Sequence, residues 1–157
     1  MIYCLDTSAL IHLGERLYPE HVPVFKPIWN HIYDSIENGG IISVDSVKIE
    51  LEKKADEWRN KFIIKAVCMF KISESIESEC AKIILEIEQG PQFLQNTHRK
   101  RFMEGADPWL IALAKSVGNC TVVSGETKKL ADFGLGPVCQ QLGVKHVGLV
   151  KFFEVIK

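Results

Sequence analysis

Four acidic residues lie at points of the sequence where they could act together in chemistry. Asp6 follows the apolar run 2–5, Glu50 lies at the edge of a helical apolar stripe, Asp107 starts an apolar helix, and Glu126 follows a β-branched strand. If the strands are parallel neighbours, Asp6 and Glu126 share one edge of the sheet, and the buried helix could aim Asp107 at the same edge. Such a cluster would be strongly anionic.

Carboxylates that lie close together repel one another and raise each other's pKa unless a cation lies among them. Oxygen ligands without His or Cys at ligand spacing select Mg²⁺ or Mn²⁺ rather than zinc. Two such ions can position an attacking water and stabilise the leaving oxygen in phosphodiester cleavage. The four acids therefore suggest a metal site with hydrolytic chemistry.

Each acid also has a simpler structural explanation. Asp6 could only cap the helix that follows it, because a carboxylate accepts the free N–H groups of a first helical turn. Asp107 could be a cap as well, with the next residue, a proline, in the first helical position. Glu50 could be a solvated helix residue and Glu126 an ordinary loop acid. Their placement together is what favours the metal hypothesis.

The elements that would position these acids alternate between strands and helices. The apolar patterns predict strands at 2–5, 41–43, 120–124 and 145–150. They predict helices from 8, over 28–38, 44–58, 76–89 and 107–117, and from 151. Segments 15–27 and 91–105 are expected to be loops, and 62–72 fits either a helix or a strand. The alternation favours an α/β fold, a three-layer α/β/α sandwich with a mostly parallel central sheet.

Composition is consistent with one domain over residues 1–157. With 46% hydrophobic and 25% charged residues, the chain can bury a core. Because 19 Lys and Arg are matched by 20 Asp and Glu, any polyanion must be met by a local basic patch. Arg99, Lys100 and Arg101 form such a run upstream of Asp107, and Lys128 is a second candidate. These side chains could receive RNA phosphates, or they could be solvated loop residues.

The cysteines and the N-terminus indicate an intracellular setting. The five cysteines are odd in number and never form a C-x-x-C pair, which supports neither a disulfide framework nor a zinc site. The N-terminus lacks the features of a signal peptide, and no apolar run approaches the roughly 18 residues that would span a bilayer. We expect a cytoplasmic protein without a membrane segment.

Four short motifs carry a family resemblance. A strand ends in Leu-Asp-Thr-Ser at 5–8, a glutamate lies early in a helix at 47–51, an acid starts the helix at 106–114, and another follows the strand at 122–126. In this order they resemble the PIN domain family. The aromatic segment near Phe25 and Trp29, the Asp-Pro-Trp start and the segment 136–139 are similar to a PIN-like subfamily, the DUF4411 group. The resemblance spans essentially the whole chain.

The resemblance implies a metal-dependent ribonuclease, often the toxin of a toxin–antitoxin pair, with RNA as substrate and an antitoxin protein as partner. Asp6, Glu50, Asp107 and Glu126 would hold Mg²⁺ or Mn²⁺, and Ser8 would support Asp6 or a metal-bound water. The family commonly has Asp at the fourth position, whereas Glu126 has a longer reach. Related domains often form homodimers.

Two alternatives stay open at this point. The chain could be a catalytically weak PIN-like binding or adaptor protein, although all four acid positions are filled, which favours the enzyme. It could also be a phosphatase of the haloacid dehalogenase type, which likewise begins with an Asp at the end of a first strand. That chemistry usually needs a second Asp two residues later, where Ser8 stands.

Overall fold

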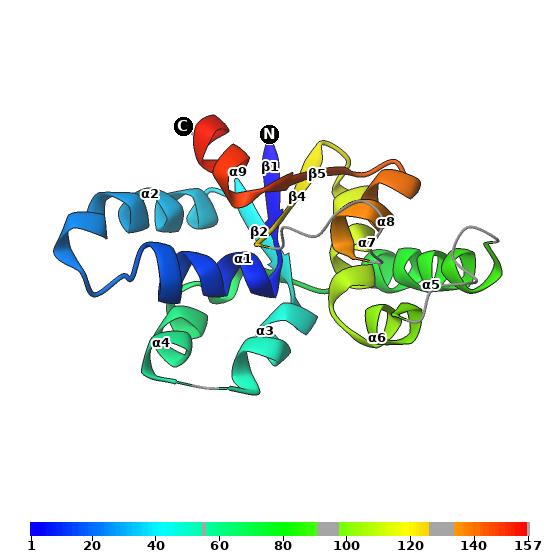
Figure 1. Cartoon of the computed structure of the whole chain (residues 1–157), viewed down its shortest axis with the longest axis horizontal. Coiled ribbons are helices and arrows are strands. Elements are labelled where there is room, and N and C mark those ends of the chain that lie inside the picture. The colour runs from blue at the N-terminus through cyan, green and yellow to red at the C-terminus, as the bar shows by residue number, and fades with distance from the viewer. Residues whose placement is uncertain (55, 91–97, 126–133, 157) are drawn as a thin grey trace.

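The computed structural model describes residues 1–54, 56–90, 98–125 and 134–156. In this part of the chain, five parallel strands form a sheet in the order β3-β2-β1-β4-β5 (Figure 1). The strands are β1 Ile2–Leu5, β2 Ile41–Val44, β3 Phe70–Lys71, β4 Cys120–Ser124 and β5 Lys145–Gly148. The four strands expected from sequence are present, and β3 adds a short edge strand. The last strand ends at Gly148 rather than at 150, because α9 begins at Leu149 rather than at 151.

Helices cover both faces of the sheet, with α2 on one side and α5 and α7 on the other (Figure 1). The α-helices are α1 Thr7–Ile11, α2 Lys26–Glu37, α3 Asp45–Glu52, α4 Glu57–Lys65, α5 Glu74–Gln89, α6 Arg99–Glu104, α7 Asp107–Val117, α8 Leu135–Gln141 and α9 Leu149–Val155. The predicted α/β/α sandwich with a parallel sheet is therefore confirmed. None of the described helices is long and apolar enough to cross a membrane.

The core explains why the chain adopts this arrangement. Strands β2 and β4 are buried along their whole length, as expected for a parallel sheet with helices on both faces. Helix α7 packs between the strands and α5, and six of its eleven residues are buried. The apolar character of α7 on nearly every side follows from this position, because both of its broad faces meet other elements.

The predicted helix over 44–58 is wrong in one respect, because two helices occupy this region. Helix α3 ends at Glu52, and α4 begins at Glu57 after Asp56, whose side chain accepts a hydrogen bond from the backbone N–H of Arg59 at 2.8 Å. A new N-cap thus restarts the helix in a different direction. The apolar stripe continues across the break, which is why periodicity alone suggested a single helix.

Two segments predicted as loops are partly helical. The chain continues from α1 through one wide turn, His12–Leu17, and α2 begins at Lys26, so that its second residue is the proline at 27. Helix α6 lies within the expected 91–105 loop because Phe102, 5% exposed, anchors it to the core. Helix α8 was not predicted, since glycine and proline in its first turn hide the helical pattern.

Candidate active site

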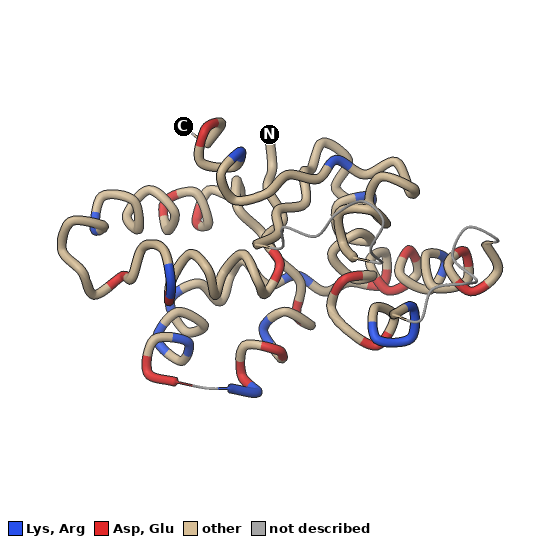
Figure 2. Tube along the Cα trace, viewed as in Figure 1, with Lys and Arg blue, Asp and Glu red and all other residues tan. Residues whose placement is uncertain are grey.

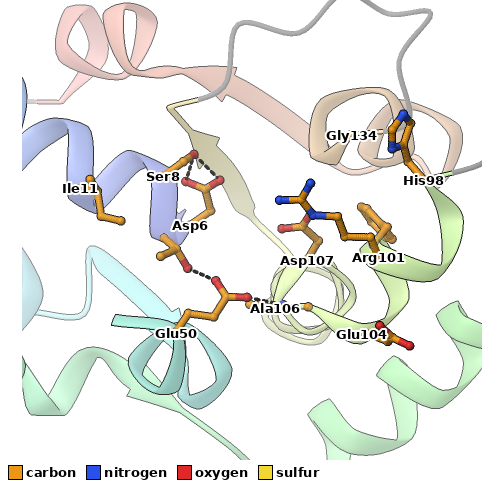
Figure 3. Close-up of a pocket in the computed structure, with 13 residues that line it drawn as sticks. Asp6, Ser8, Ile11, Glu50, His98, Arg101, Glu104, Ala106, Asp107 and Gly134 are labelled. Carbon is orange, nitrogen blue, oxygen red and sulfur yellow. Dashed lines mark hydrogen bonds between the residues drawn. The ribbon is translucent and has the colours of Figure 1, made fainter. Parts of the chain in front are cut away.

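A pocket of about 500 Å³ opens beyond the carboxyl end of β1. Helices α1, α3, α6 and α7 contribute its walls, so that segments more than fifty positions apart in the sequence meet there (Figure 3). Three predicted acids line it, and the full lining is Asp6, Thr7, Ser8, Ile11, Glu50, His98, Arg101, Phe102, Glu104, Gly105, Ala106, Asp107 and Gly134. Asp6, Glu50 and Asp107, three of the four acids singled out from the sequence, thus line one pocket.

Asp6 is held from several directions at the end of β1. The residue is only 5% exposed. Its backbone N–H donates to the carbonyl of Val123 on β4 at 3.0 Å, and its side chain accepts from the N–H of Ala9 at 2.5 Å. The hydroxyl of Ser8 donates to the Asp6 carboxylate at 2.7 and 2.9 Å. Asp6 therefore caps α1 and lines the pocket at the same time.

Ser8 connects Asp6 to the neighbouring strand. While its hydroxyl donates to Asp6, the same oxygen accepts from the backbone N–H of Gly125, just past β4, at 2.9 Å. The supporting role that was predicted for Ser8 toward Asp6 thus has a direct geometric basis. Because the Ser8 hydroxyl donates to Asp6 and accepts from Gly125, the orientation of the Asp6 carboxylate is coupled to the position of the end of β4.

Glu50 extends from α3 into the pocket and makes two long-range hydrogen bonds. One carboxylate oxygen accepts from the hydroxyl of Thr7 in α1, and the other accepts from the backbone N–H of Ala106 at 3.0 Å (Figure 3). The partners lie 43 and 56 positions away in the sequence. Glu50 is half-buried, so the interpretation of it as an ordinary solvated helix residue is wrong.

Asp107 occupies a different helix position from the one expected. Ala106 is the N-cap of α7, Asp107 is the first helical residue and Pro108 the second, so the predicted assignment of Asp as cap and Pro as first residue is shifted by one. A carboxylate in the first turn interacts favourably with the positive end of the helix. From this position the Asp107 side chain lines the pocket (Figure 3).

Two of these carboxylates affect the pKa of the Cys139 thiol on α8. Burial is the main cause of the raised pKa of Cys139, and the negative charges of Asp107 and Asp6 raise it further. Cys139 itself is buried and is not a lining residue of the pocket.

The basic residues of α6 do not all face the pocket. The side chain of Arg101 lines the pocket and points toward Asp107, and His98 lines the pocket as well (Figure 3). Arg99 and Lys100 are not among the lining residues, and the exposed Lys100 amine lies 3.9 Å from the carboxylate of Glu104. Figure 2 shows this basic helix beside the acidic start of α7. Arg101 is thus the member of the run best placed to meet a bound anion.

Two predicted site residues, Glu126 and Lys128, lie outside the described residues. Sequence reasoning in turn missed Thr7 as a partner of Glu50. Thr7 directly follows Asp6 at the start of α1, and this adjacency was the available signal. His98, the first residue of the same basic run as Arg101, stands at the N-cap of α6 and lines the pocket.

The oxygen donors of the pocket fit a hard divalent cation. Mg²⁺ is commonly bound through one or two carboxylates, with water and substrate phosphate completing the shell. Asp6 and Asp107 provide two such carboxylates in one pocket. Within residues 1–54, 56–90, 98–125 and 134–156, no three His, Cys, Asp or Glu side chains converge closely enough to form a complete ion site by themselves.

Comparison with known proteins adds a family match. The model of DUF4411, described as a domain of unknown function, matches residues 3–157. No curated protein and no solved structure matches the chain. The match covers every element that builds the pocket.

Proposed function

We propose that this chain, which belongs to the DUF4411 family, is a PIN-like, metal-dependent ribonuclease that hydrolyses phosphodiester bonds in RNA. The observation that carries the proposal is one pocket lined by Asp6, Glu50, Asp107 and Arg101, with Arg101 pointing toward Asp107 (Figure 3). A phosphodiester is an anion, and it would be repelled by three carboxylates alone. A cation among the acids, together with the arginine beside them, would make the pocket suited to a phosphate.

Four described residues have direct roles in this proposal. Asp6 and Asp107 would hold Mg²⁺ or Mn²⁺, and Ser8 keeps the Asp6 carboxylate turned into the pocket. When bound, such an ion supplies positive charge to the phosphate oxygens and lowers the pKa of a water. Arg101 would bind a phosphate of the RNA, since its guanidinium matches the oxygen pair of a phosphate. Glu126 and Lys128 remain further members of the proposed ligand and RNA-binding sets.

The substitution Asp6→Asn tests this function directly. An asparagine can still accept the hydrogen bond from Ala9, which caps α1, but it removes the charge that an ion needs. Mn²⁺-dependent cleavage of a fluorescent RNA should fall by roughly 100-fold or more, about 2.7 kcal/mol, because the ion's contribution to such reactions is several kcal/mol. The readout is the initial cleavage rate, with circular dichroism to verify folding.

The matched control is Asp34→Asn, the same change at an exposed residue of α2 that does not line the pocket. It should cleave like the unchanged protein. Full activity of Asp6→Asn, or cleavage by the unchanged protein that persists in a chelator, would remove the proposal.

The resemblance to PIN domains extends the proposal to a biological role. Such nucleases are often the toxin of a toxin–antitoxin pair, so we include an antitoxin protein and a homodimeric state in what is proposed. A non-catalytic adaptor is the competing proposal, and it predicts RNA or protein binding that is unaffected by Asp6→Asn.

A further inference from the structure

We infer that Glu50 is a positioning residue, which joins the start of α1 to the start of α7 and so sets the separation of Asp6 and Asp107, rather than a ligand of the metal ion. The link itself is independent of any reaction, while its consequence for metal binding rests on the proposed function. The observation is the pair of hydrogen bonds that Glu50 accepts, from the hydroxyl of Thr7 and from the backbone N–H of Ala106 at 3.0 Å (Figure 3).

Both partners of Glu50 are sequence neighbours of a pocket acid. Thr7 follows Asp6, and Ala106 precedes Asp107. If the Glu50 carboxylate moved, Thr7 and Ala106 would move with it, and each would displace the pocket acid that is its neighbour in the sequence. Glu50 is thus hydrogen-bonded to the first residue of α1 and to the N-cap of α7 at the same time.

The hydrogen bonds of Glu50 join more distant segments than those that Asp6 accepts from Ser8 and Ala9. The side chain of Asp6 accepts hydrogen bonds from Ser8 and Ala9 in its own helix, which fix its orientation locally. Glu50 instead uses one oxygen for each of two distant elements. Turning this carboxylate toward an ion would break a contact between elements, whereas Asp6 already faces the pocket with its local contacts in place.

The start of α7 has a specific need for an acceptor. Its N-cap is Ala106, which has no side-chain acceptor, and the N–H of Ala106 itself needs an acceptor as well. In a capping box, a glutamate of the same helix reaches back to the N–H of the N-cap residue. Glu50 makes this contact from α3, and a Cβ added at Gly105 would lie 3.5 Å from the same Glu50 oxygen, so the approach is close.

The test compares Glu50→Gln with Glu50→Ala in the full chain, by calorimetric titration with Mn²⁺. Glutamine keeps an acceptor for the Ala106 N–H and a polar partner for the Thr7 hydroxyl, but it has no charge. Because these contacts are kept, a positioning role predicts that the Kd of Glu50→Gln for Mn²⁺ stays within about threefold of that of the unchanged protein. A threefold change in Kd is well under the 1.4 kcal/mol that corresponds to a tenfold change. Glu50→Ala should weaken Mn²⁺ binding roughly 10- to 100-fold, the usual effect of losing a residue that orients a ligand.

Two variants serve as references. Asp6→Asn shows the effect of losing a true ligand, and Glu52→Gln makes the same charge change at an exposed position of α3. If Glu50→Ala does not fold, Thr7→Val removes only one hydroxyl of the link and should weaken Mn²⁺ binding with little loss of stability. The inference is overturned if Glu50→Gln weakens Mn²⁺ binding as much as Asp6→Asn does, or if Glu50→Ala binds like the unchanged protein.

Failure of the proposed function would look different. If the unchanged protein binds no Mn²⁺, the ribonuclease proposal fails, and the link is then judged by hydrogen exchange of the Ala106 amide. Exchange at least about tenfold faster in Glu50→Ala, but not in Glu50→Gln, would support the link, since a tenfold change corresponds to 1.4 kcal/mol, near the net value of one hydrogen bond. Equal exchange in both variants would overturn it.

Discussion

Gly125 sits where β4 meets α1, and replacing it with alanine should disturb both the fold and the pocket. A Cβ at this position would lie 2.6 Å from the carbonyl oxygen of Ser8 and 2.8 Å from Nδ1 of His12. The first of these atoms belongs to the backbone and cannot turn away. The start of α1 must therefore move away from the end of β4 by several tenths of an ångström.

The magnitude follows from the cost of overpacking. Forced shifts of this kind cost roughly 1–3 kcal/mol. For a chain of this size each 1 kcal/mol lowers Tm by about 2–4 °C, so about 2 kcal/mol would lower it by about 4–8 °C. Because the N–H of Gly125 donates to the Ser8 hydroxyl that orients Asp6, Mn²⁺-dependent cleavage should fall further than the folded fraction does.

The assay is thermal unfolding by circular dichroism, with Gly148→Ala as the matched control. Gly148 ends β5 beside Ser124, and an added Cβ there meets no atom within 4 Å. Because Gly148 is the N-cap of α9, where alanine is less favourable than glycine, the Tm of Gly148→Ala should fall by no more than the equivalent of about 1 kcal/mol. A Gly125→Ala protein as stable as Gly148→Ala would show that α1 and β4 are not in tight contact, and the argument about Asp6 would lose its basis.

Two further predictions can be checked quickly. Arg101→Ala should reduce the slope of log Kd against log salt concentration for single-stranded RNA by about 0.7, the value for one phosphate contact. Lys100→Ala should reduce this slope less. Fluorescence anisotropy titrations at several salt concentrations measure the slopes, and equal slopes for the two variants would argue against a role for the pocket arginine. Cys68 is the exposed cysteine, whereas the other four are buried and burial raises the pKa of Cys80 to about 11, so iodoacetamide at pH 8 should add one label to the native protein and more only after unfolding. Mass spectrometry counts the labels, and rapid uptake of several by folded protein would contradict the core packing.

Much of the fold was predictable because its signals are local. The β-branched strand 120–124 and the apolar helix that starts at Asp107 appear in the sequence as continuous patterns with clear ends. The strong apolar character of α7 also indicated, correctly, that it is buried. From these elements, the edge of the sheet at which the acids meet could be expected before any coordinates.

The elements that were missed depend on features that leave no mark on the apolar pattern. Helix α6 is short and basic, and its main anchor is the buried side chain of Phe102. The break between α3 and α4 depends on one capping residue, Asp56, within a stripe that is otherwise continuous. Neither feature changes the apolar period, so a reading based on that period could not detect them.

The candidate site shows a division between local and distant contacts. Asp6 was predicted either as a cap or as a pocket acid, and local geometry lets it be both. Glu50 was predicted as a ligand because it is an acid at the right place, but its partners are known only once α1 and α7 are folded. From the sequence, only a cation was expected to relieve the repulsion among these acids. In the structure, backbone N–H groups at the starts of α1 and α7 bind Asp6 and Glu50, so part of this relief comes from the protein itself. Direct measurement of Mn²⁺ binding, rather than the presence of the acids, is therefore the decisive test of the metal.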